Sequence, residues 1–254
     1  MQCENGYEDY FVAYFDILGF KSDIENFHMG YVLEQYREVL RILKKEYADA
    51  MWFSDSFVLY TKIDTEKSIC GGVDAAQSFF HEMFKRYIPL RGCMNIGGFY
   101  VDSKKGIFFG PCLNKAYKLA ENQNWIGLVL TEVIKERLKG LKVDDQSVWD
   151  ILNKQFIEYE VPFKKEIENC KLQTYNFKIL LNSTAADEVS MKLEKESEVL
   201  FDALNEMKFK YELLCRENKK GNGEKFNLDE EDKVKVKYEN TKKFLLTVFP
   251  NLIN

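Results

Sequence analysis

Two acidic residues, Asp16 and Asp55, stand where they could act together on a metal ion. Asp16 interrupts the end of a nearly continuous apolar run, residues 10–18, and Asp55 lies in the turn Ser54-Asp55-Ser56 between two short apolar segments. Burying a lone carboxylate is unfavourable unless a cation or a metal pairs with it, and a divalent cation relieves the repulsion between two neighbouring carboxylates. Either residue alone is typical of a cap or a turn, but the pair in this order favours a metal site.

Two further features indicate a place for phosphate groups. Gly19 lets the chain turn sharply after the apolar run, so that the backbone N–H groups of Gly19, Phe20 and Lys21 can face phosphate oxygens. Arg91 opens a segment otherwise rich in small and apolar residues, and an Arg there needs an anionic partner. That partner is either a ligand or a carboxylate of the protein in an ordinary salt bridge, and the sequence leaves both open.

A helix expected at about residues 112–122 carries two more polar side chains on one face. Pro111 is typical of a helix start, and Asn114 and Lys118 are four residues apart. An amide and a cation in this arrangement can hold a ribose and a phosphate. Taken by themselves, however, the two residues are better explained as part of a solvated helix surface.

The elements that must position these residues alternate between strands and amphipathic helices. Apolar runs and turn signals predict strands at residues 10–18, 51–53, 57–61, 90–101, 106–109 and 126–131, and two edge strands at 157–162 and 172–181. Helices are predicted from apolar stripes over Val32, Tyr36, Val39 and Leu43, over Ile69, Val73, Ala76, Phe80 and Phe84, and at residues 112–122 and 132–139. This order predicts an α/β fold of the α+β sandwich type, with helices on one face of a mostly antiparallel sheet.

The composition of the chain changes after Asn182. A heptad-like stripe predicts a helix over Leu193, Leu200, Leu204, Met207, Tyr211 and Leu214. The segment Gly221–Gly223 interrupts it, and a second helical stretch runs from about Asp229 to Phe249. We therefore expect an α+β domain over residues 1–184 and a C-terminal helical hairpin over residues 185–254, which packs on the sheet or on a second subunit.

The overall composition excludes several classes of protein. The 254 residues are 46% hydrophobic and 30% charged, which is typical of a globular chain. A formal net charge of −5 argues against a dedicated duplex-binding protein but leaves room for a small anionic ligand. No apolar run is long enough to cross a bilayer, and the N-terminus lacks the features of a signal peptide. Six cysteines without CxxC spacing predict free thiols in a reducing cytoplasm and no zinc site.

Together, the chemically suggestive segments resemble the class III nucleotidyl cyclase domain, the catalytic fold of adenylate and guanylate cyclases. The matching pieces follow the order of that family within residues 9–131, and they are Phe15–Phe20, Phe53–Asp55, Leu90–Gly97 and Gly110–Ala120, with a weaker continuation at Tyr159–Lys164. The resemblance implies a ferredoxin-like domain that acts as a homodimer. It also implies the conversion of a nucleoside triphosphate into a 3′,5′-cyclic nucleotide and pyrophosphate, with two Mn²⁺ or Mg²⁺ ions per site.

The resemblance assigns the metal ions and the reacting sugar to residues of different subunits. Asp16 and Asp55 of one subunit would hold the metal ions, together with the backbone carbonyl of Ile17. Asn114 of the other subunit would orient the ribose, and Lys118 would stabilise the transition state. A symmetric homodimer would therefore contain two sites.

The same resemblance implies a set of contacts to the triphosphate. These are the backbone of Gly19, Phe20 and Lys21, the Arg91 side chain and, on a looser alignment, Lys164.

Three departures from the family pattern bear on the substrate. Lys118 stands where the family has an Arg. A lysine keeps the positive charge but lacks the planar guanidinium group that can form two parallel hydrogen bonds. The two polar residues that select a purine are replaced by Met51 and Ile107. With Trp52 and Phe53 beside Met51, the base pocket is expected to be apolar and small, which favours a pyrimidine.

This pattern is most similar to the bacterial Pycsar antiphage cyclases, which make cyclic UMP or cyclic CMP. The resemblance implies UTP or CTP as substrate, a cytoplasmic location, no membrane or nucleic-acid partner, and an effector that senses the product without touching the enzyme. Two alternatives remain open. One is a catalytically silent cyclase-like module that binds a nucleotide or a partner, and the other is a nucleic-acid-binding sandwich of ferredoxin type.

Overall fold

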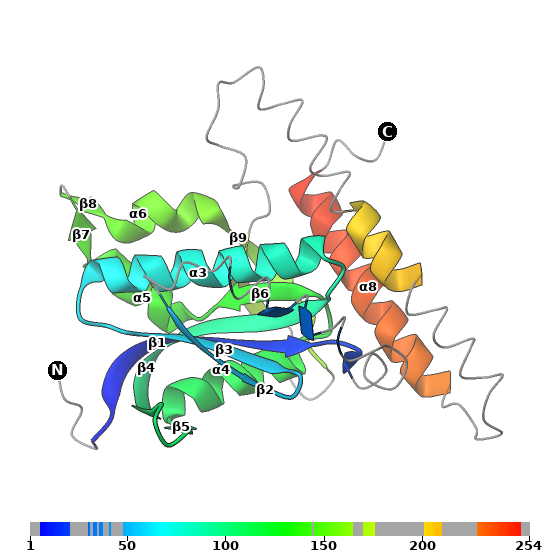
Figure 1. Ribbon diagram of the computed structural model, residues 1–254. Helices are drawn as coiled ribbons and strands as arrows, with labels where there is room; N and C mark the ends of the chain where they lie inside the picture. Colours follow the sequence, from blue (N-terminus) through cyan, green and yellow to red (C-terminus); the bar gives the residue numbers. More distant parts are fainter. Residues whose placement is uncertain are drawn as a thin grey trace.

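The computed structural model describes residues 6–20, 48–143, 145–164, 170–175, 201–209 and 228–249, together with residues 30, 33, 34, 36, 37 and 41. Its first half has five main elements, which are β1 (Glu8–Ile17), β2 (Asp49–Phe53), β3 (Ser56–Lys62), α3 (Glu66–Lys85) and β4 (Leu90–Asp102). The four strands lie in the order β2-β3-β1-β4, and their pairings are antiparallel. This is the strand order of a ferredoxin-like sheet, and the predicted α+β class is confirmed (Figure 1).

The second half extends this sheet beyond β4. Its elements are β5 (Ile107–Phe109), α4 (Pro111–Asn122), β6 (Gly127–Leu130), α5 (Glu132–Gly140), β7 (Lys142–Val143), β8 (Gln146–Ser147), α6 (Val148–Leu152), a 3₁₀ turn (Asn153–Gln155), β9 (Phe156–Val161) and β10 (Cys170–Tyr175). The order continues as β4-β6-β10-β9, and only the β4–β6 pairing is parallel among the described strands. The two late strands were both expected at an edge. That is right for β9 but wrong for β10, which lies between β6 and β9.

Helices cover both faces of the sheet, so the prediction of helices on one face is wrong. On β1, Phe15 packs against Phe79 of α3, with ring centroids 4.9 Å apart. The next residue back along the strand, Tyr14, faces the opposite side and packs against Tyr117 of α4, 5.4 Å away. Successive side chains of a strand point to opposite faces, and β1 is apolar on both because each face is covered (Figure 1).

The C-terminal helix α8 (Leu228–Val248) packs against the sheet end that carries β6 and β9. Phe244 is fully buried and lies 5.0 Å from Trp125 and 4.8 Å from Tyr159, measured between ring centroids. Residues 201–209 form a second helical segment, whose Lys208 makes an ion pair with Glu239 of α8. Packing of the extension on the sheet agrees with one of the two arrangements expected for it. Whether residues 185–254 form a separate domain stays a prediction.

Several residues on which the predicted helices depend lie outside the described residues. The stripe residues Val32, Val39 and Leu43 and the break at 221–223 are outside them.

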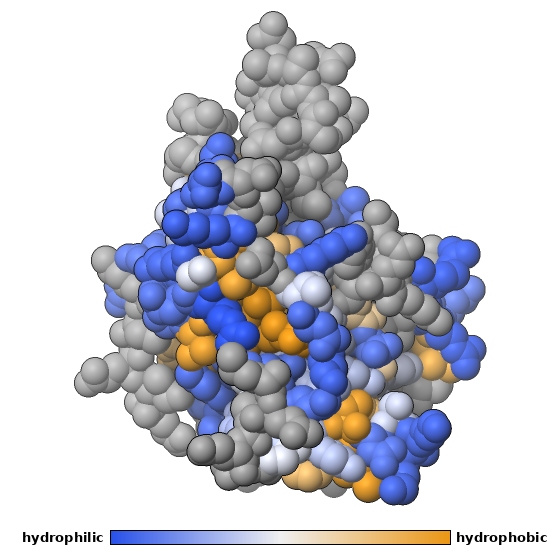
Figure 2. Space-filling view, turned by 90° about the vertical axis from the view of Figure 1, so that its left-hand side faces the viewer, coloured by the Kyte–Doolittle hydropathy of each residue, from blue (hydrophilic) through white to orange (hydrophobic). Residues whose placement is uncertain are grey.

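The three cysteine side chains that the structure describes, Cys70, Cys93 and Cys112, are free thiols, as expected. No helix in the described part of the chain is both long and apolar enough to span a membrane. Figure 2 shows mainly hydrophilic residues on one side of the molecule, with apolar residues in separate patches between them.

Candidate active site

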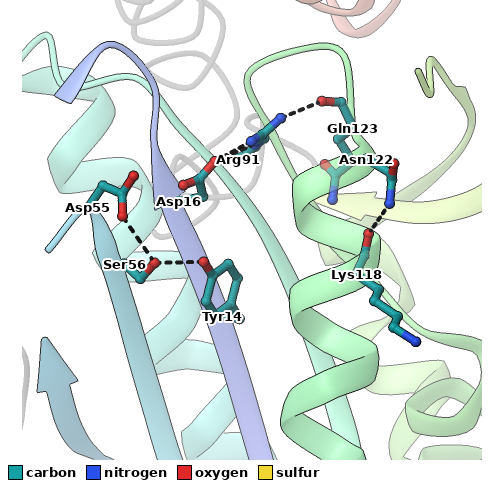
Figure 3. A network of polar contacts seen from close by, with 8 residues as sticks. All are labelled: Tyr14, Asp16, Asp55, Ser56, Arg91, Lys118, Asn122 and Gln123. Atoms are coloured by element: carbon teal, nitrogen blue, oxygen red, sulfur yellow. Dashed lines mark hydrogen bonds and ion pairs between the residues drawn. The ribbon is translucent and has the colours of Figure 1, made fainter. Parts of the chain in front are cut away.

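Strand pairing brings the two predicted carboxylates to the same end of the sheet. Asp16, near the end of β1, is paired with Ser56 of β3 on one side and with Arg91 of β4 on the other. The backbone N–H of Ile17 donates a hydrogen bond to the carbonyl oxygen of Asp55, at 2.9 Å. The β2–β3 turn is therefore fastened to the end of β1, and Figure 3 shows the two aspartates next to each other. The expected convergence is present in the structure.

A cavity of about 400 Å³ opens at this end of the sheet. It is lined by six of the residues proposed from the sequence, which are Asp16, Ile17, Gly19, Phe20, Asp55 and Arg91. Other lining residues are Tyr14, Leu18, Ser56, Tyr117, Glu121 and Lys237. Lys21 lies outside the described residues. Apart from Lys21 and Lys164, the residues assigned to metal and triphosphate thus share one cavity, while their roles remain predictions.

The turn after β1 has the geometry that the glycine predicts. Gly19 has a φ of +83°, a conformation that residues with a Cβ adopt only with strain, and no atom lies within 4 Å of where its Cβ would be. The glycine is therefore required by the backbone conformation and not by close packing. Together with Phe20, it forms part of the cavity wall.

Arg91 forms a buried ion pair with Asp16. Its Nε and Nη2 atoms lie 2.6 Å and 2.5 Å from Oδ2 of Asp16, and the two side chains are only 9% and 13% exposed. The Nη1 atom donates to the backbone carbonyl of Gln123, at 3.1 Å. Burial raises the pKa of the Asp16 carboxyl, and the Arg91 guanidinium opposes part of that rise. The guanidinium therefore offsets the burial of this carboxylate only in part, so a further cation would stabilise its charged form.

Asp55 is less constrained than Asp16. Its carboxylate accepts one long hydrogen bond, 3.5 Å from the hydroxyl of Ser56. That hydroxyl is also 2.6 Å from the hydroxyl of Tyr14, and burial raises the pKa of Tyr14 to about 12 (Figure 3). Tyr14 therefore stays protonated and neutral beside the two carboxylates at neutral pH.

The donor set around Asp16 and Asp55 suits a hard divalent cation. Two carboxylates and a neighbouring backbone carbonyl are the oxygen ligands that Mg²⁺ and Mn²⁺ prefer. Oδ1 of Asp16 has no hydrogen-bond partner among the described residues, so it is available to a ligand. Within the described ranges, no group of three or more His, Cys, Asp or Glu side chains forms a closed metal cage. The pair therefore fits ions that keep water and substrate oxygens as their remaining ligands.

A second cavity of about 400 Å³ adjoins the first, and Tyr14, Ser56 and Tyr117 line both. It contains Met51 and Phe53, two of the expected base-pocket residues, and also Asn114. Ile107, the third expected residue, is 42% exposed and does not line the cavity, although the residues on either side of it, Gly106 and Phe108, do.

Trp52 does not belong to this pocket, which corrects the expectation that it narrows the space for a base. Its ring stacks on Phe57, with centroids 5.2 Å apart, and also contacts Tyr36. Residues 51 and 53 share one face of β2, so the residue between them must face the other way.

The remaining predicted residues are separate from the carboxylate pair in this chain. Lys118 is exposed on α4, and Figure 3 shows its side chain directed away from Asp16 and Asp55. Asn114, also exposed, reaches the second cavity only. Lys164 follows β9, and its backbone N–H donates to the carbonyl of Asn122 at 2.8 Å. The contribution of Asn114 and Lys118 from a second subunit stays a prediction.

Six lining residues were not proposed from the sequence, and three of them, Tyr14, Leu18 and Ser56, lie within about two positions of proposed ones along the chain, at β1 and the β2–β3 turn. The other three come from helices. Tyr117 and Glu121 lie three and seven residues after Asn114, so the helical spacing that singled out Asn114 and Lys118 could have found them. The hydrogen bond between the two raises the pKa of Tyr117. Lys237 of α8 is the third, and no local pattern connects it with residues 14–121, which supply the rest of the cavity wall.

No family model and no curated protein matches this sequence. Solved structures do match. Its structural neighbours are adenylyl and guanylyl cyclase domains. One is the catalytic core of a rhodopsin-guanylyl cyclase with converted specificity in complex with ATPαS, at 14% identity and a TM-score of 0.49, covering 66% of this chain and 95% of the other.

Two further neighbours are similar in extent. The dimeric guanylyl cyclase domain of the RhoGC fusion protein from the aquatic fungus Blastocladiella emersonii shares 16% identity, with a TM-score of 0.47 and coverage of 66% and 95%. An adenylate/guanylate cyclase/hydrolase from Silicibacter pomeroyi shares 15% identity, with a TM-score of 0.46 and coverage of 66% and 96%. All three TM-scores are below 0.5, so these similarities do not assign an activity to this chain.

Proposed function

We propose that this chain is a nucleotidyl cyclase, which converts a nucleoside triphosphate into a 3′,5′-cyclic nucleotide and pyrophosphate. The observation that carries the proposal is the cavity in which the Asp16 and Asp55 carboxylates lie together with the Arg91 cation and the Gly19 turn. Carboxylates that suit divalent ions, next to cationic and backbone groups that suit phosphate, are the parts that phosphoryl transfer requires.

In the proposed reaction, the 3′-oxygen of the sugar forms a bond to the α-phosphorus. The bond from that phosphorus to the oxygen that bridges to the β-phosphate breaks, pyrophosphate leaves and the 3′-hydroxyl proton is released. Mn²⁺ or Mg²⁺ ions held by Asp16, Asp55 and the Ile17 carbonyl would activate the hydroxyl and neutralise charge. Gly19 and Phe20 bind the triphosphate through their backbone, and Arg91 compensates its charge from β4.

We propose a homodimer as the active form. In this chain Asn114 and Lys118 are exposed on α4, where a second subunit can meet them. Asn114 of one subunit then orients the ribose in the site of the other, and Lys118 binds the phosphate on which negative charge develops. Two equivalent sites follow from the symmetry.

We propose a pyrimidine triphosphate as the substrate, with UTP favoured over CTP, and a product that acts as a second messenger in antiphage defence. The support is the sequence resemblance and the apolar character of the second cavity at Met51 and Phe53. Its polar lining consists of Asn114 and three hydroxyl-bearing side chains, Tyr14, Ser56 and Tyr117, and among the described residues that line it there is no charged group to read a purine edge.

The test is to incubate the pure protein with each of the four nucleoside triphosphates and Mn²⁺, and to identify the products by mass spectrometry. We expect a 3′,5′-cyclic pyrimidine nucleotide and pyrophosphate in equal amounts. Absence of any cyclic product from all four substrates, with Mn²⁺ and with Mg²⁺, would contradict the proposed activity.

Met51→Lys tests the base preference. A cation at this position can bind an acceptor on the base that the methionine side chain cannot, so we expect purine turnover to rise relative to pyrimidine turnover by about tenfold. Met51→Leu is the matched control, because it changes the shape but keeps the pocket apolar. An unchanged product profile in Met51→Lys would show that this residue does not select the base.

A catalytically silent nucleotide-binding module is the second candidate. The observation that favours it is the Arg91–Asp16 ion pair, because the same carboxylate would serve both a guanidinium and a metal ion. Such a module would bind a triphosphate without forming pyrophosphate, so the product assay separates the two candidates.

A further inference from the structure

We propose that Lys237 of α8 is a phosphate-binding residue of the candidate site, so that the C-terminal helical extension completes the site that the sheet begins. The inference rests on the proposed function for the identity of its ligand, the polyphosphate part of a nucleotide. It gives the extension a function in substrate binding in addition to its packing on the sheet.

Lys237 lines the cavity that contains Asp16, Asp55 and the Gly19 turn. Every other described residue that lines it comes from residues 14–121, whereas Lys237 comes from a helix far along the chain. Among the described residues, no carboxylate forms an ion pair with its ammonium group, and the nearby Asp16 is paired with Arg91 through Oδ2.

The helix that carries Lys237 is fixed to the site by specific contacts. The buried Thr241 hydroxyl accepts a hydrogen bond from the backbone N–H of Ile126, at 2.8 Å, and donates one to the carbonyl of Lys237 itself, at 2.8 Å. The Asn240 side chain donates to the carbonyl of Asn124, also at 2.8 Å. The segment it docks on, residues 122–126, also holds Arg91 through the carbonyl of Gln123. Both cations are thus positioned by one loop.

The charges around Lys237 also indicate a site for an anion. Arg91 from β4, Lys164 from the segment after β9 and Lys233 from α8 repel its charge, whereas Asp16 attracts it. Burial, with help from these cations, lowers the pKa of Lys237 to about 8. Cations held close together are unfavourable in the free protein, and an anion with several charges would relieve that repulsion. A triphosphate in the cavity carries enough negative charge to offset Arg91 and Lys237 together, since both residues line it.

The experiment compares Lys237→Met, Lys237→Arg and the control Lys242→Met in the full-length chain. Lys242 is an exposed lysine of the same helix. Binding of inorganic tripolyphosphate is measured by titration calorimetry at fixed ionic strength, and KM is measured for UTP with Mn²⁺. We expect Lys237→Met to weaken tripolyphosphate binding by about ten- to a hundredfold, the usual value of a hydrogen bond to a charged group. Lys237→Arg should recover most of the affinity, and Lys242→Met should bind as the unaltered protein does.

Thermal unfolding at pH 7 separates a binding role from a structural one. Since Lys237 is repelled by its neighbours, its replacement by methionine should leave the stability of the free protein unchanged or raise it. A loss of stability that accompanies the loss of affinity, with no recovery in Lys237→Arg, would assign Lys237 a structural role and overturn the proposal.

The outcomes also distinguish this inference from the proposed function. Tripolyphosphate binding that depends on Lys237 in a protein that forms no cyclic nucleotide would support the phosphate site and reject the cyclase. Cyclic product with unchanged tripolyphosphate affinity in Lys237→Met would support the cyclase and overturn the inference. A protein that does not bind tripolyphosphate at all would overturn it as well.

Discussion

Asp55→Asn is expected to lower the rate of cyclic-nucleotide formation by about a thousandfold, since a metal ligand in phosphoryl transfer is worth several kcal/mol of transition-state stabilisation. The change removes a charge but keeps the size of the side chain. The Asp55 carboxylate makes only one long hydrogen bond, to Ser56, so the fold should be preserved. Product formation is followed by mass spectrometry, and Mn²⁺ binding by electron paramagnetic resonance, which should show weaker binding in the variant.

Asp49→Asn is the matched control for this substitution. Asp49 is exposed at the start of β2, in the same hairpin as Asp55 but outside both cavities. We expect full activity and unaltered Mn²⁺ binding in this variant. Turnover by Asp55→Asn at the rate of the unaltered protein would exclude Asp55 as a metal ligand in catalysis and would remove the main support for the proposed activity.

Asp16→Ala is expected to lower the free energy of unfolding by about 3 to 5 kcal/mol, because it leaves the buried Arg91 guanidinium without its counter-charge. The two side chains are only 13% and 9% exposed, so solvent screens the remaining Arg91 charge poorly. Against a typical total stability of about 5 to 15 kcal/mol, this loss is large. Urea unfolding followed by circular dichroism measures it.

An exposed ion pair on the same strand provides the comparison. Glu8 of β1 pairs with Lys62 of β3 at 2.6 Å, and both side chains are more than 40% exposed. Glu8→Ala should therefore cost about 1 kcal/mol or less. The double variant Asp16→Ala, Arg91→Met should regain most of the stability that Asp16→Ala loses. Equal losses in Asp16→Ala and Glu8→Ala would show that the buried pair contributes nothing beyond a surface contact.

Asp16 thus has a structural contact, its ion pair with Arg91, and a proposed role as a metal ligand. The ion pair is expected to stabilise the fold, whereas the position of Asp16 next to Asp55 in the cavity makes it a candidate metal ligand. The Arg91 question that the sequence left open is answered in part, since a carboxylate of the protein is its partner in this structure. Arg91 nevertheless lines the cavity, so the salt bridge and the proposed contact to phosphate are compatible.

The local patterns of the chain predicted most of the strands and helices. The apolar run at β1, the turn at Asp55 and the apolar stripe of α3 were found because hydrophobic periodicity and turn residues are local signals. The same locality explains the errors. Alternation along one strand cannot tell which layer covers each face, so the position of α4 on the second face was missed. Likewise, the position of β10 between β6 and β9 depends on its pairing with strands from other parts of the sequence.

The sequence by itself determined the types of the groups that line the candidate site. It contained an aspartate that ends a strand apolar on both faces, a glycine turn directly after it, and a second aspartate in a hairpin turn. Only the tertiary structure decided that the antiparallel register sets Asp16 beside Arg91, that Trp52 faces away from the base pocket, and that Lys237 enters the cavity. The physical reason is that register and helix docking are set by the burial of apolar side chains from distant segments. A cation on a helix more than a hundred residues downstream leaves no local trace of the site it joins.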